Sequence, residues 1–250
     1  MRAGPFRVGF MRYAAGAVQP THAHGESGLT LVLAGSIAER VGRVDEVGEP
    51  LSVVIKPAGV EHADVVGPRG AYTLRITFDP AAIAANMDDV PREWRWLHGG
   101  PAVRRLVAVA RRIARSQSRL GIEDGIYDAL GVLGDDPVLR GSPPAWLRRV
   151  REILDDAFPE RVTIRMLASA VGAHPVSVSR AFRRHYGRSV TAYRRWARVR
   201  RAAKLIPERR RDLSAAAFDA GYADHSHLCR EFRTATGIGP GEYRVLVTRP

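Results

Sequence analysis

The side chains of this chain best suited to chemistry are arginines that recur in two matching segments near the C-terminus. Residues 180–183 read RAFR and are followed by Gly187, and residues 230–233 read REFR and are followed by Gly237 at the same distance. The planar guanidinium group can form two parallel hydrogen bonds with guanine O6 and N7, and it also neutralises phosphate. The repeat therefore indicates two sites that contact DNA.

A second group that could do chemistry lies near the N-terminus, where His22 and His24 flank a single alanine and His62 follows forty residues later. Side chains alternate along a strand, so a His-x-His pair presents both imidazoles on one face. A histidine from a neighbouring strand could complete a three-nitrogen site for a divalent metal. With Glu26, the three histidines are also the residues that we expect to line an effector pocket at the mouth of the N-terminal domain.

The arginine repeats belong to helix patterns that are themselves duplicated. Each repeat follows a short apolar helix pattern and a glycine, Gly172 in the first copy and Gly221 in the second. We therefore predict two helix-turn-helix units, at residues 164–186 and 213–236. A helix over 190–206, stopped by Pro207, should join them as a rod of roughly 25 Å. A rod of this length would place two reading helices near the spacing of successive major grooves.

Helical phase separates the buried residues of each reading helix from those that face outward. The apolar pairs one turn apart, Val178 with Phe182 and Leu228 with Phe232, should face the core. The outward faces then carry the residues that we predict to contact DNA: Val176, Ser179, Arg180, Arg183, His225, Ser226, Arg230 and Arg233.

The chemistry of the outward residues suggests a role for each arginine. Arg180 and Arg230 are placed for guanine, while Arg183 and Arg233, one turn later, are better placed for phosphate. Asp224 stands just before the second reading helix, where an aspartate caps the helix instead of meeting the phosphates that would repel it.

Upstream, residues 1–80 have the pattern of a β domain. Tyr72, Leu74, Ile76 and Phe78 alternate with more polar residues, which predicts a strand with one buried face. Short apolar runs at 30–34 and 52–55 are bounded by glycine and proline, as in a small barrel or sandwich.

Residues 81–134 have a helical pattern, with an apolar stripe from Val103 to Ala114 and arginines around it. The stripe must pack on the β domain or on the same helix of a second subunit in a homodimer, and the arginines are expected to be a solvated face. Residues 135–144, DDPVLRGSPP, have the composition of a linker. The DNA-binding domain would then occupy residues 145–250, opening with an amphipathic helix near Trp146.

Charge is distributed unequally between the two halves. The chain of 250 residues has a formal net charge of +13, and +12 of this lies from Gly141 to the C-terminus. A basic half is the electrostatic footprint of a nucleic-acid partner. Cys229 is the only cysteine, and we find neither a signal peptide nor an apolar run long enough for a membrane span. We therefore expect a cytoplasmic protein with no membrane partner.

Residues 146–244 resemble the C-terminal domain of AraC-type transcriptional regulators. The resemblance rests on LASAVGAHPVSVSRAFRRHYG, AYRRWARVRRAAKLI and AAFDAGYADHSHLCREFRTATGIGPGEYR. His174 departs from the usual serine cap, His225 and His227 from the usual glutamine and aromatic residue, and Leu228 from the usual phenylalanine. The resemblance implies a double helix-turn-helix that binds double-stranded DNA, and contact with RNA polymerase if the protein is an activator.

The N-terminal histidines resemble the two motifs of cupin barrels, through Gly16, His22-Ala23-His24, Pro57-Ala58-Gly59 and His62. The metal-binding glutamate of those barrels is missing, because Gly28 stands four residues after His24 and Val66 takes the second motif's asparagine position. Glu26 could replace that glutamate only in a bulged strand. We therefore expect pocket-lining histidines and no metal cofactor, with a divalent metal held by His22, His24 and His62 as the alternative.

Together these patterns predict an α+β protein of two domains. A cupin-like β-barrel with a helical extension would sense a small effector, and an all-α domain of two helix-turn-helix units joined by a long helix would read DNA. We expect a sequence-specific transcription regulator and not an enzyme. Two alternatives stay open: a metal-dependent cupin enzyme with a basic DNA-associating domain, and an architectural DNA binder without sequence preference.

Overall fold

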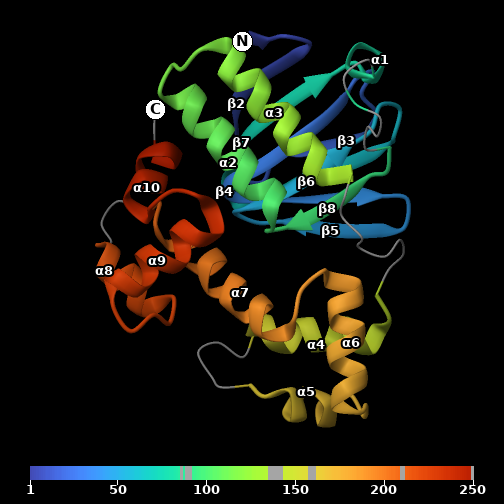
Figure 1. Cartoon of the computed structure of the whole chain (residues 1–250). Helices are drawn as coiled ribbons and strands as arrows, with labels where there is room; N and C mark the ends of the chain where they lie inside the picture. The colour runs from blue at the N-terminus through green and yellow to red at the C-terminus, as the bar shows by residue number, and fades with distance from the viewer. Residues whose placement is uncertain (85–86, 88–91, 135–142, 157–161, 209–211, 249–250) are drawn as a thin grey trace.

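The computed structural model describes residues 1–84, 87, 92–134, 143–156, 162–208 and 212–248. An antiparallel sheet occupies the N-terminal part, and helices form the C-terminal part (Figure 1). The predicted linker, residues 135–144, lies outside the described residues except for its last two prolines. None of the described helices combines the length and the apolar character needed to cross a bilayer.

The sheet has eight strands in the described residues, and its main path runs in the order β1-β2-β7-β4-β6-β8. Two long strands, β4 and β7, pair along most of their length; at one end β4 also pairs with β5, and β7 with β3. This sheet is not closed into a barrel: β1 and β8 are the two ends of the described path, so the expected cupin-like barrel is an open, strongly bent sheet. The strands are β1 (Arg2–Ala3), β2 (Phe6–Tyr13), β3 (Val18–His22), β4 (Ser27–Val41), β5 (Val44–Gly48), β6 (Ser52–Lys56), β7 (His62–Phe78) and β8 (Arg95–His98).

Alternation of side chains decides which face of the sheet is buried under helices. In β7, Leu74 and Ile76 are fully buried and pack in one cluster with Leu29 and Leu31 of β4. The period-two pattern therefore predicted the buried face of this strand correctly. Thr73, on the opposite face, is also buried, which shows that both faces of the bent sheet are covered at this point.

Three helices follow the long strands: α1 (Pro80–Ile83), α2 (Pro101–Ala114) and α3 (Arg119–Gly134). In the apolar stripe of α2, Val103, Leu106 and Val107 are fully buried in the same cluster as the sheet, and Ile113 and Ala114 pack against it while partly buried. The stripe therefore packs within the chain and is not free for the same helix of a second subunit. The segment expected to be helical, 81–134, also contributes β8, which pairs with β6.

The C-terminal helices lie close to their expected positions. They are α4 (Ala145–Asp156), α5 (Ile164–Ala170), α6 (Pro175–Tyr186), α7 (Val190–Leu205), α8 (Leu213–Asp219), α9 (His225–Thr236) and α10 (Pro240–Thr248). α5 with α6 is the first helix-turn-helix unit, α8 with α9 is the second, and α7 joins them. The end of α7 before Pro207 was predicted correctly, because proline cannot continue the hydrogen-bond ladder of a helix.

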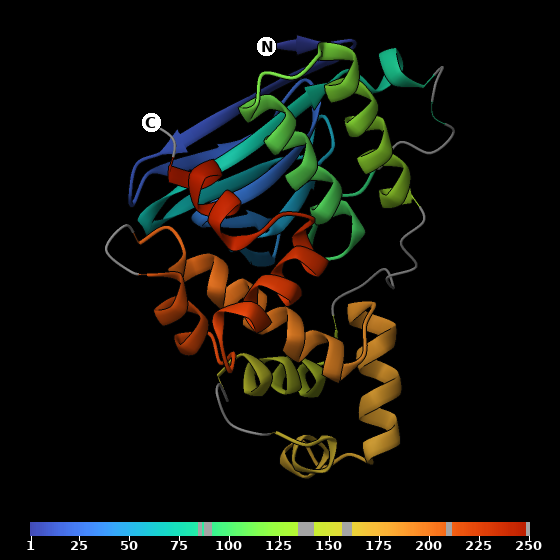
Figure 2. The same ribbon diagram turned by 60° about the vertical axis from the view of Figure 1, so that its left-hand side comes forward.

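The helices divide between two apolar cores. One core unites the sheet, α2 and α3 with residues of α7, α9 and α10, including Trp196, Phe232 and Tyr243. The other contains only α4 to α7, around Leu147, Val178 and Phe182. In Figure 2 the second helix-turn-helix unit and α10 lie against the sheet and α2, while α4 to α6 extend away below. The sheet thus shares a core with one reading unit and not with the other.

Candidate nucleic-acid interface and histidine cluster

The first reading helix, α6, is bounded by residues that suit its two ends. His174 caps its start, because Nδ1 of His174 accepts a hydrogen bond from the N–H of Val176 at 3.3 Å, and Pro175 takes the first turn. Gly187 ends the helix in the left-handed conformation, which glycine adopts without strain. The histidine that replaces the expected serine cap therefore still caps the helix.

The second reading helix, α9, has the same design. The carboxylate of Asp224 accepts a hydrogen bond from the N–H of His227 at 2.6 Å, so its predicted capping role is confirmed. Gly237 ends the helix in the left-handed conformation. The predicted core pair of each reading helix, Val178 with Phe182 and Leu228 with Phe232, is fully buried, which confirms the helical phase.

The residues predicted to contact DNA all lie on exposed faces. Val176, an apolar residue, leaves 48% of its surface exposed. Among the described residues, none of the four outward arginines has a carboxylate within ion-pair distance, so their charges are free to meet phosphate or base edges. The exposed set is Val176, Ser179, Arg180, Arg183, His225, Ser226, Arg230 and Arg233. Their contact with DNA stays a prediction.

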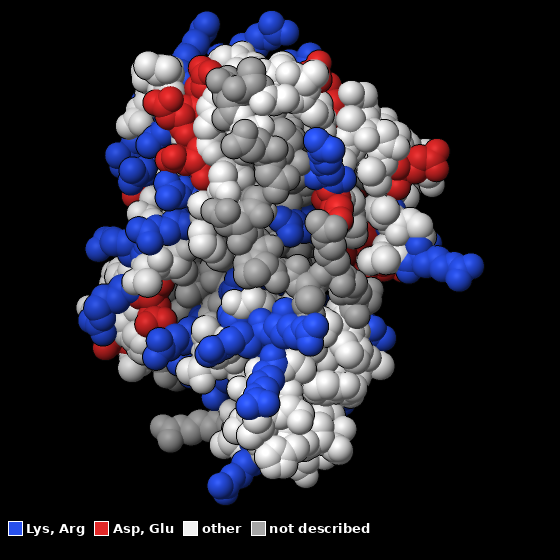
Figure 3. Space-filling view, turned by 45° about the vertical axis from the view of Figure 1, so that its right-hand side comes forward, with Lys and Arg blue, Asp and Glu red and all other residues white. Residues whose placement is uncertain are grey.

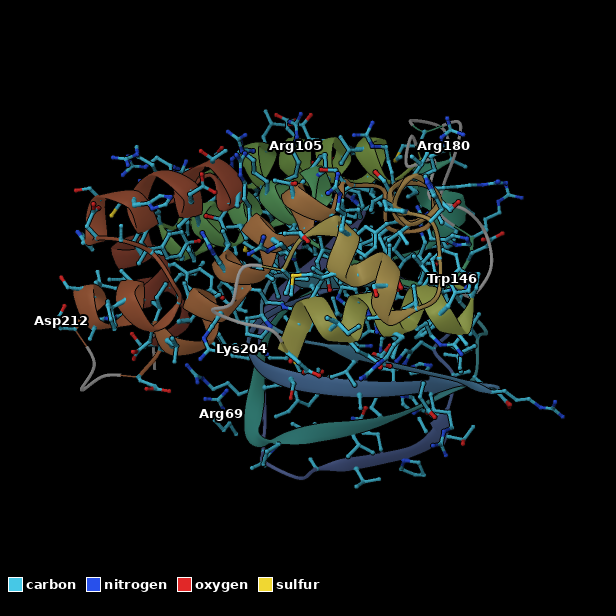
Figure 4. The ribbon with its side chains drawn as sticks, turned by 90° about the horizontal axis from the view of Figure 1, so that it is seen from below. Arg69, Arg105, Trp146, Arg180, Lys204 and Asp212 are labelled. Atoms are coloured by element: carbon cyan, nitrogen blue, oxygen red, sulfur yellow. The ribbon has the colours of Figure 1, made fainter. Side chains whose placement is uncertain are left out.

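Lysine and arginine side chains gather on the helical part of the molecule. Figure 3 shows them projecting from the lower half, over the region that α4 to α6 occupy in Figure 1. Seen from below, Arg180 lies at the edge of the molecule opposite to the sheet, whereas Lys204 lies between the helices and the strands (Figure 4). Cationic residues of the helical part therefore lie in two places: on the outer face, as Arg180 does, and next to the sheet, as Lys204 does.

His225 and Cys229 of α9 contact one another one turn apart. The Sγ atom of Cys229 lies 3.5 Å from Nε2 of His225. The single cysteine thus packs against a predicted contact residue.

The second reading unit is attached to the sheet mainly by apolar contacts. Phe232 and Tyr243 stack edge to face and belong to the core that the sheet provides. The hydroxyl of Tyr243, fully buried, donates a hydrogen bond to the carbonyl of Leu33 in β4. At the rim, the carboxylate of Glu242 lies 2.6 Å from a guanidinium nitrogen of Arg115, the residue that follows α2.

The helices α4 and α7, which flank the first reading unit, meet the sheet through charged groups as well. Glu49, which follows β5, lies 2.5 Å from Nζ of Lys204 and 3.3 Å from Nε of Arg200, both on α7. Arg200 also pairs with Asp155 of α4 at 2.7 Å, and the hydroxyl of Tyr193 donates to the same carboxylate. These ion pairs connect α4 and α7 to Glu49 beside β5, and α7 also packs on the core of the sheet through Trp196 and Val199.

A second set of polar contacts centres on Glu46 of β5. Its carboxylate oxygen lies 3.1 Å from Nε2 of His98 and 3.5 Å from a guanidinium nitrogen of Arg151 in α4. The other ring nitrogen of His98 lies 2.9 Å from Oγ of Ser52. Glu46, His98 and Arg151 line a cleft of about 770 Å³ between the strands and the first reading unit.

Electrostatics in this cleft favours the ionised carboxylates. Burial alone would raise the pKa of Glu46, but the hydrogen bond from His98 and the charge of Arg151 outweigh it, so the pKa is lowered. Burial likewise opposes ionisation of Glu49, and its contacts with Lys204 and Arg200 lower its pKa overall. Both carboxylates therefore remain charged where they meet the helices.

The three N-terminal histidines predicted to share a site come together. One ring nitrogen of each of His22, His24 and His62 lies within 4.8 Å of the others, and the rings contact one another. Burial, followed by the charge of Arg75, lowers the pKa of His24 to about 4. Burial also lowers the pKa of His62. His24 and His62 are therefore neutral imidazoles at neutral pH.

Glu26 does not join this cluster. Its carboxylate pairs with Arg7 of β2, and it lines a separate open hollow with Arg7, Val8, Arg75 and Thr77. Glu26 stands in the bend between β3 and β4, outside both strands. The acidic neighbour of the cluster is instead Asp64, whose Oδ2 lies 3.9 Å from Nε2 of His62.

Sequence reasoning missed Asp64 and the charged contacts between the sheet and α7. Asp64 stands two residues after His62 in the same strand, so the period-two rule that paired His22 with His24 could have found it. Glu49 and Lys204 are 155 residues apart, and no local pattern connects them.

Comparisons with known proteins agree with the helical part of this site. Residues 167–245 match a protein-family model described as a helix-turn-helix domain. The chain is similar to the uncharacterized HTH-type transcriptional regulator YpdC of Escherichia coli K12, with 27% identity over 90 residues, 36% of this chain and 32% of that protein. It is also similar to the bifunctional transcriptional activator/DNA repair enzyme AdaA of Bacillus subtilis 168, with 25% identity over 99 residues, 40% of this chain and 47% of that protein.

These similarities are partial in length. The chain spans about a third to a half of the two curated relatives. A crystal structure of ToxT from Vibrio cholerae O395 aligns with 98% of this chain and 99% of its own length, at a TM-score of 0.43 and 9% sequence identity.

Proposed function

We propose that this protein, whose residues 167–245 form a helix-turn-helix domain of the AraC type, is a sequence-specific DNA-binding transcription regulator. One observation carries the proposal: two capped reading helices of matching phase expose cationic faces at the two ends of α7. α7 has 16 residues, which give a rod of roughly 24 Å. A rod of this length would let one duplex receive α6 and α9 in successive major grooves.

Affinity and sequence choice would come from different residues. Cationic groups on the helical half, Arg183 and Arg233 among them, would neutralise phosphates and supply salt-dependent affinity. Arg180 and Arg230, one turn earlier, would read base edges, where the bidentate geometry of arginine selects guanine. We place this activity in the cytoplasm, where the target DNA of such a regulator lies.

The N-terminal domain would modulate DNA binding through its contacts with the helices. β7 begins at His62 and pairs with β4, and β4 presents the Leu33 carbonyl that accepts the hydrogen bond from Tyr243. A small effector held near the histidines would therefore act on a sheet that is continuous with the second reading unit. Such an effector changes DNA affinity only if it binds one arrangement of the two reading units more tightly than another. The size of the change is limited by that difference in affinity.

Selection of binding sites from random DNA duplexes with the full chain tests the proposal. We expect enrichment of a two-part site whose halves lie about 10 base pairs apart. If no sequence is enriched and the affinity varies with salt concentration but not with DNA sequence, the protein is an architectural DNA binder.

Two arginine variants test the assignment of roles within α9. Arg230→Ala should relax the base preference at one position and weaken the selected site by roughly 1–3 kcal/mol, whereas Arg233→Ala should weaken all sequences alike and reduce the salt dependence. Arg149→Ala, which removes an exposed arginine of α4, is the control and should change neither property. Identical behaviour of the two α9 variants would show that the assigned phase of DNA contact is wrong.

A further inference from the structure

A second hollow, which we call the arginine groove, lies where α2 meets the end of α9. Its volume is about 740 Å³, within the range of sites that bind small molecules. It is separate from the cleft that Glu46 lines, because the two hollows share only Gly100 and Pro101. The arginine groove is lined by side chains of α2, by Trp196 of α7 and by the last turn of α9.

The indole of Trp196 offers an unused hydrogen-bond donor in the wall of this groove. Trp196 is 6% exposed, and its Nε1 has no hydrogen-bond partner among the described residues. The ring is held in place, since a Cβ on Gly99 would lie 2.5 Å from it and the guanidinium of Arg188 lies 5.6 Å from its centroid. A buried N–H group without an acceptor is unfavourable, so this position favours a ligand that supplies one.

Arg111 of α2 offers a second unused donor to the same groove. Its Nε is buried and makes no hydrogen bond within the described part of the chain. A terminal nitrogen of Arg111 lies 4.0 Å from the carboxylate of Glu242, and that carboxylate also pairs with Arg115 at 2.6 Å. One carboxylate thus faces two guanidinium groups, and one positive charge is left without a partner.

The exposed arginines of α2 add to the charge of the groove. Arg105, which Figure 4 shows at the edge of the molecule away from the strands, pairs with Asp128 at 3.0 Å. Arg104 has no carboxylate within ion-pair distance in the described ranges of the chain, and it packs on the end of α9, where a Cβ on Gly237 would lie 3.5 Å from its Nε. Its charge offsets the partial negative charge at the carbonyl end of that helix.

We propose that the arginine groove binds a small organic phosphate whose phosphate group accepts hydrogen bonds from Arg104, Arg111 and Trp196. A phosphate monoester carries close to two negative charges and three terminal oxygens. The four arginines of this surface face only Asp128 and Glu242, which leaves two positive charges for the ligand to neutralise. Guanidinium groups are the side chains best matched to phosphate oxygens.

The burial of the donors favours a free molecule over the backbone of DNA. Nε1 of Trp196 and Nε of Arg111 are both buried, whereas a duplex meets only groups on the outer surface. The long side chains of Arg104 and Arg105 are exposed, and their rotation admits a small ligand to the groove.

The remaining walls of the groove suit the carbon skeleton of such a ligand. Pro101 and Ala108 line it from α2, and Ala235 and Ile238 line it from the end of α9 and the residues after it. A bound molecule would therefore contact α2, α7 and α9 at once and stabilise their arrangement. This regulatory consequence rests on the proposed function, whereas binding of the phosphate does not depend on it.

Calorimetric titration of the full chain with inorganic phosphate, without DNA, tests the site. We expect one equivalent to bind, with an affinity that rises above about pH 6, where the second proton of a phosphate monoester leaves. Arg104→Ala, at an exposed position, and Trp196→Phe, which keeps an aromatic ring but removes the N–H group, should each weaken binding by about 10-fold or more. Circular dichroism checks that both variants are folded.

Trp96→Phe is the matched control for the indole, because Nε1 of Trp96 is also buried without a partner in the described residues but lines the other cleft. Arg119→Ala is the control for charge, because it removes an exposed arginine outside the groove. Both controls should bind phosphate like the wild type.

Absence of phosphate binding by the wild type, or unchanged binding by both groove variants, would overturn the proposal. If the wild type ignores phosphate while Arg104→Ala weakens binding of a duplex, the groove belongs to the DNA surface and the proposal is wrong. Because phosphate binding is measured without DNA, a chain that selects no duplex refutes the regulator, and a chain that binds no phosphate refutes only this site.

Discussion

The first reading unit has an apolar core of its own, whereas the second shares a core with the N-terminal sheet. Locally the two are alike, with a capped reading helix, a buried apolar pair and a closing glycine. They differ in what lies behind the buried pair. For α9 this is the sheet and α2; for α6 it is α4, α5 and Tyr193 of α7, and α4 contacts β5 through the ion pair of Arg151 with Glu46.

This difference assigns different roles to similar helices. Apolar burial is not screened by salt and costs several kcal/mol to undo, so α9 is fixed relative to the sheet. Partly exposed ion pairs contribute about 1 kcal/mol or less each and weaken with salt. We therefore infer that the sheet holds the second reading unit firmly and the first unit loosely. A change in the distance between α6 and α9 would then come from movement of the first unit.

The largest expected effect comes from removing the buried phenylalanine of each unit. Phe182→Ala and Phe232→Ala should each cost about 3–5 kcal/mol through lost contacts and a cavity. Phe232→Ala should destabilise the sheet together with the second unit, because they share one core. Phe182→Ala should open only α4 to α6, which hydrogen exchange measured by mass spectrometry can resolve. Equal destabilisation of the sheet by both variants would contradict the comparison.

The next effect concerns the hydroxyl that joins α10 to β4. Tyr243→Phe keeps the ring in the core but leaves the buried carbonyl of Leu33 without its donor, at a cost of about 1–3 kcal/mol. Chemical denaturation should show the loss, and exchange of α10 and β4 should quicken together. Tyr186→Phe, whose hydroxyl makes a longer contact of 3.5 Å with Leu147 in the first unit, should cost less and leave β4 unchanged.

A smaller effect is expected from the charged contact between α7 and the strands. Arg200→Ala removes pairs with both Glu49 and Asp155 and should cost about 1–2 kcal/mol, since the groups are only partly shielded from water. Exchange in α4 to α6 should rise while the sheet stays protected. Arg149→Ala, which breaks an exposed pair with Glu152, should stay within about 0.5 kcal/mol of the wild type. A loss of sheet protection in Arg200→Ala would show that the two units are attached alike.

The smallest effect is a pH dependence confined to the first unit. Glu46 and Glu49 have lowered pKa values in the folded protein, so their contribution is complete above their ordinary value of about 4.5. It is lost as the pH falls below that value and through the folded-state pKa values. The thermal midpoint of the wild type should therefore fall more steeply below pH 4.5 than that of a Glu46→Gln, Glu49→Gln double variant. Parallel curves would contradict a role for these carboxylates.

The sequence by itself determined the local design of the reading units. Helix caps, closing glycines and the four-residue spacing of Val178 with Phe182 and Leu228 with Phe232 act within a single turn, so their positions follow from neighbours along the chain. The same holds for the strand from Tyr72 to Phe78, whereas the strand expected to carry both His22 and His24 ends at His22. Each of these features depends on short-range geometry with a fixed period.

Only the tertiary structure decided which surfaces meet. The apolar stripe of α2 could have packed on the sheet or on a second subunit, and in the structure it packs on the sheet. The described strands form an open path where a closed barrel was expected. Glu26 pairs with Arg7, and the carboxylate next to the histidines is that of Asp64. Contacts such as Glu49 with Lys204 join residues far apart in the chain, and their energy depends on distance and burial that no local pattern encodes.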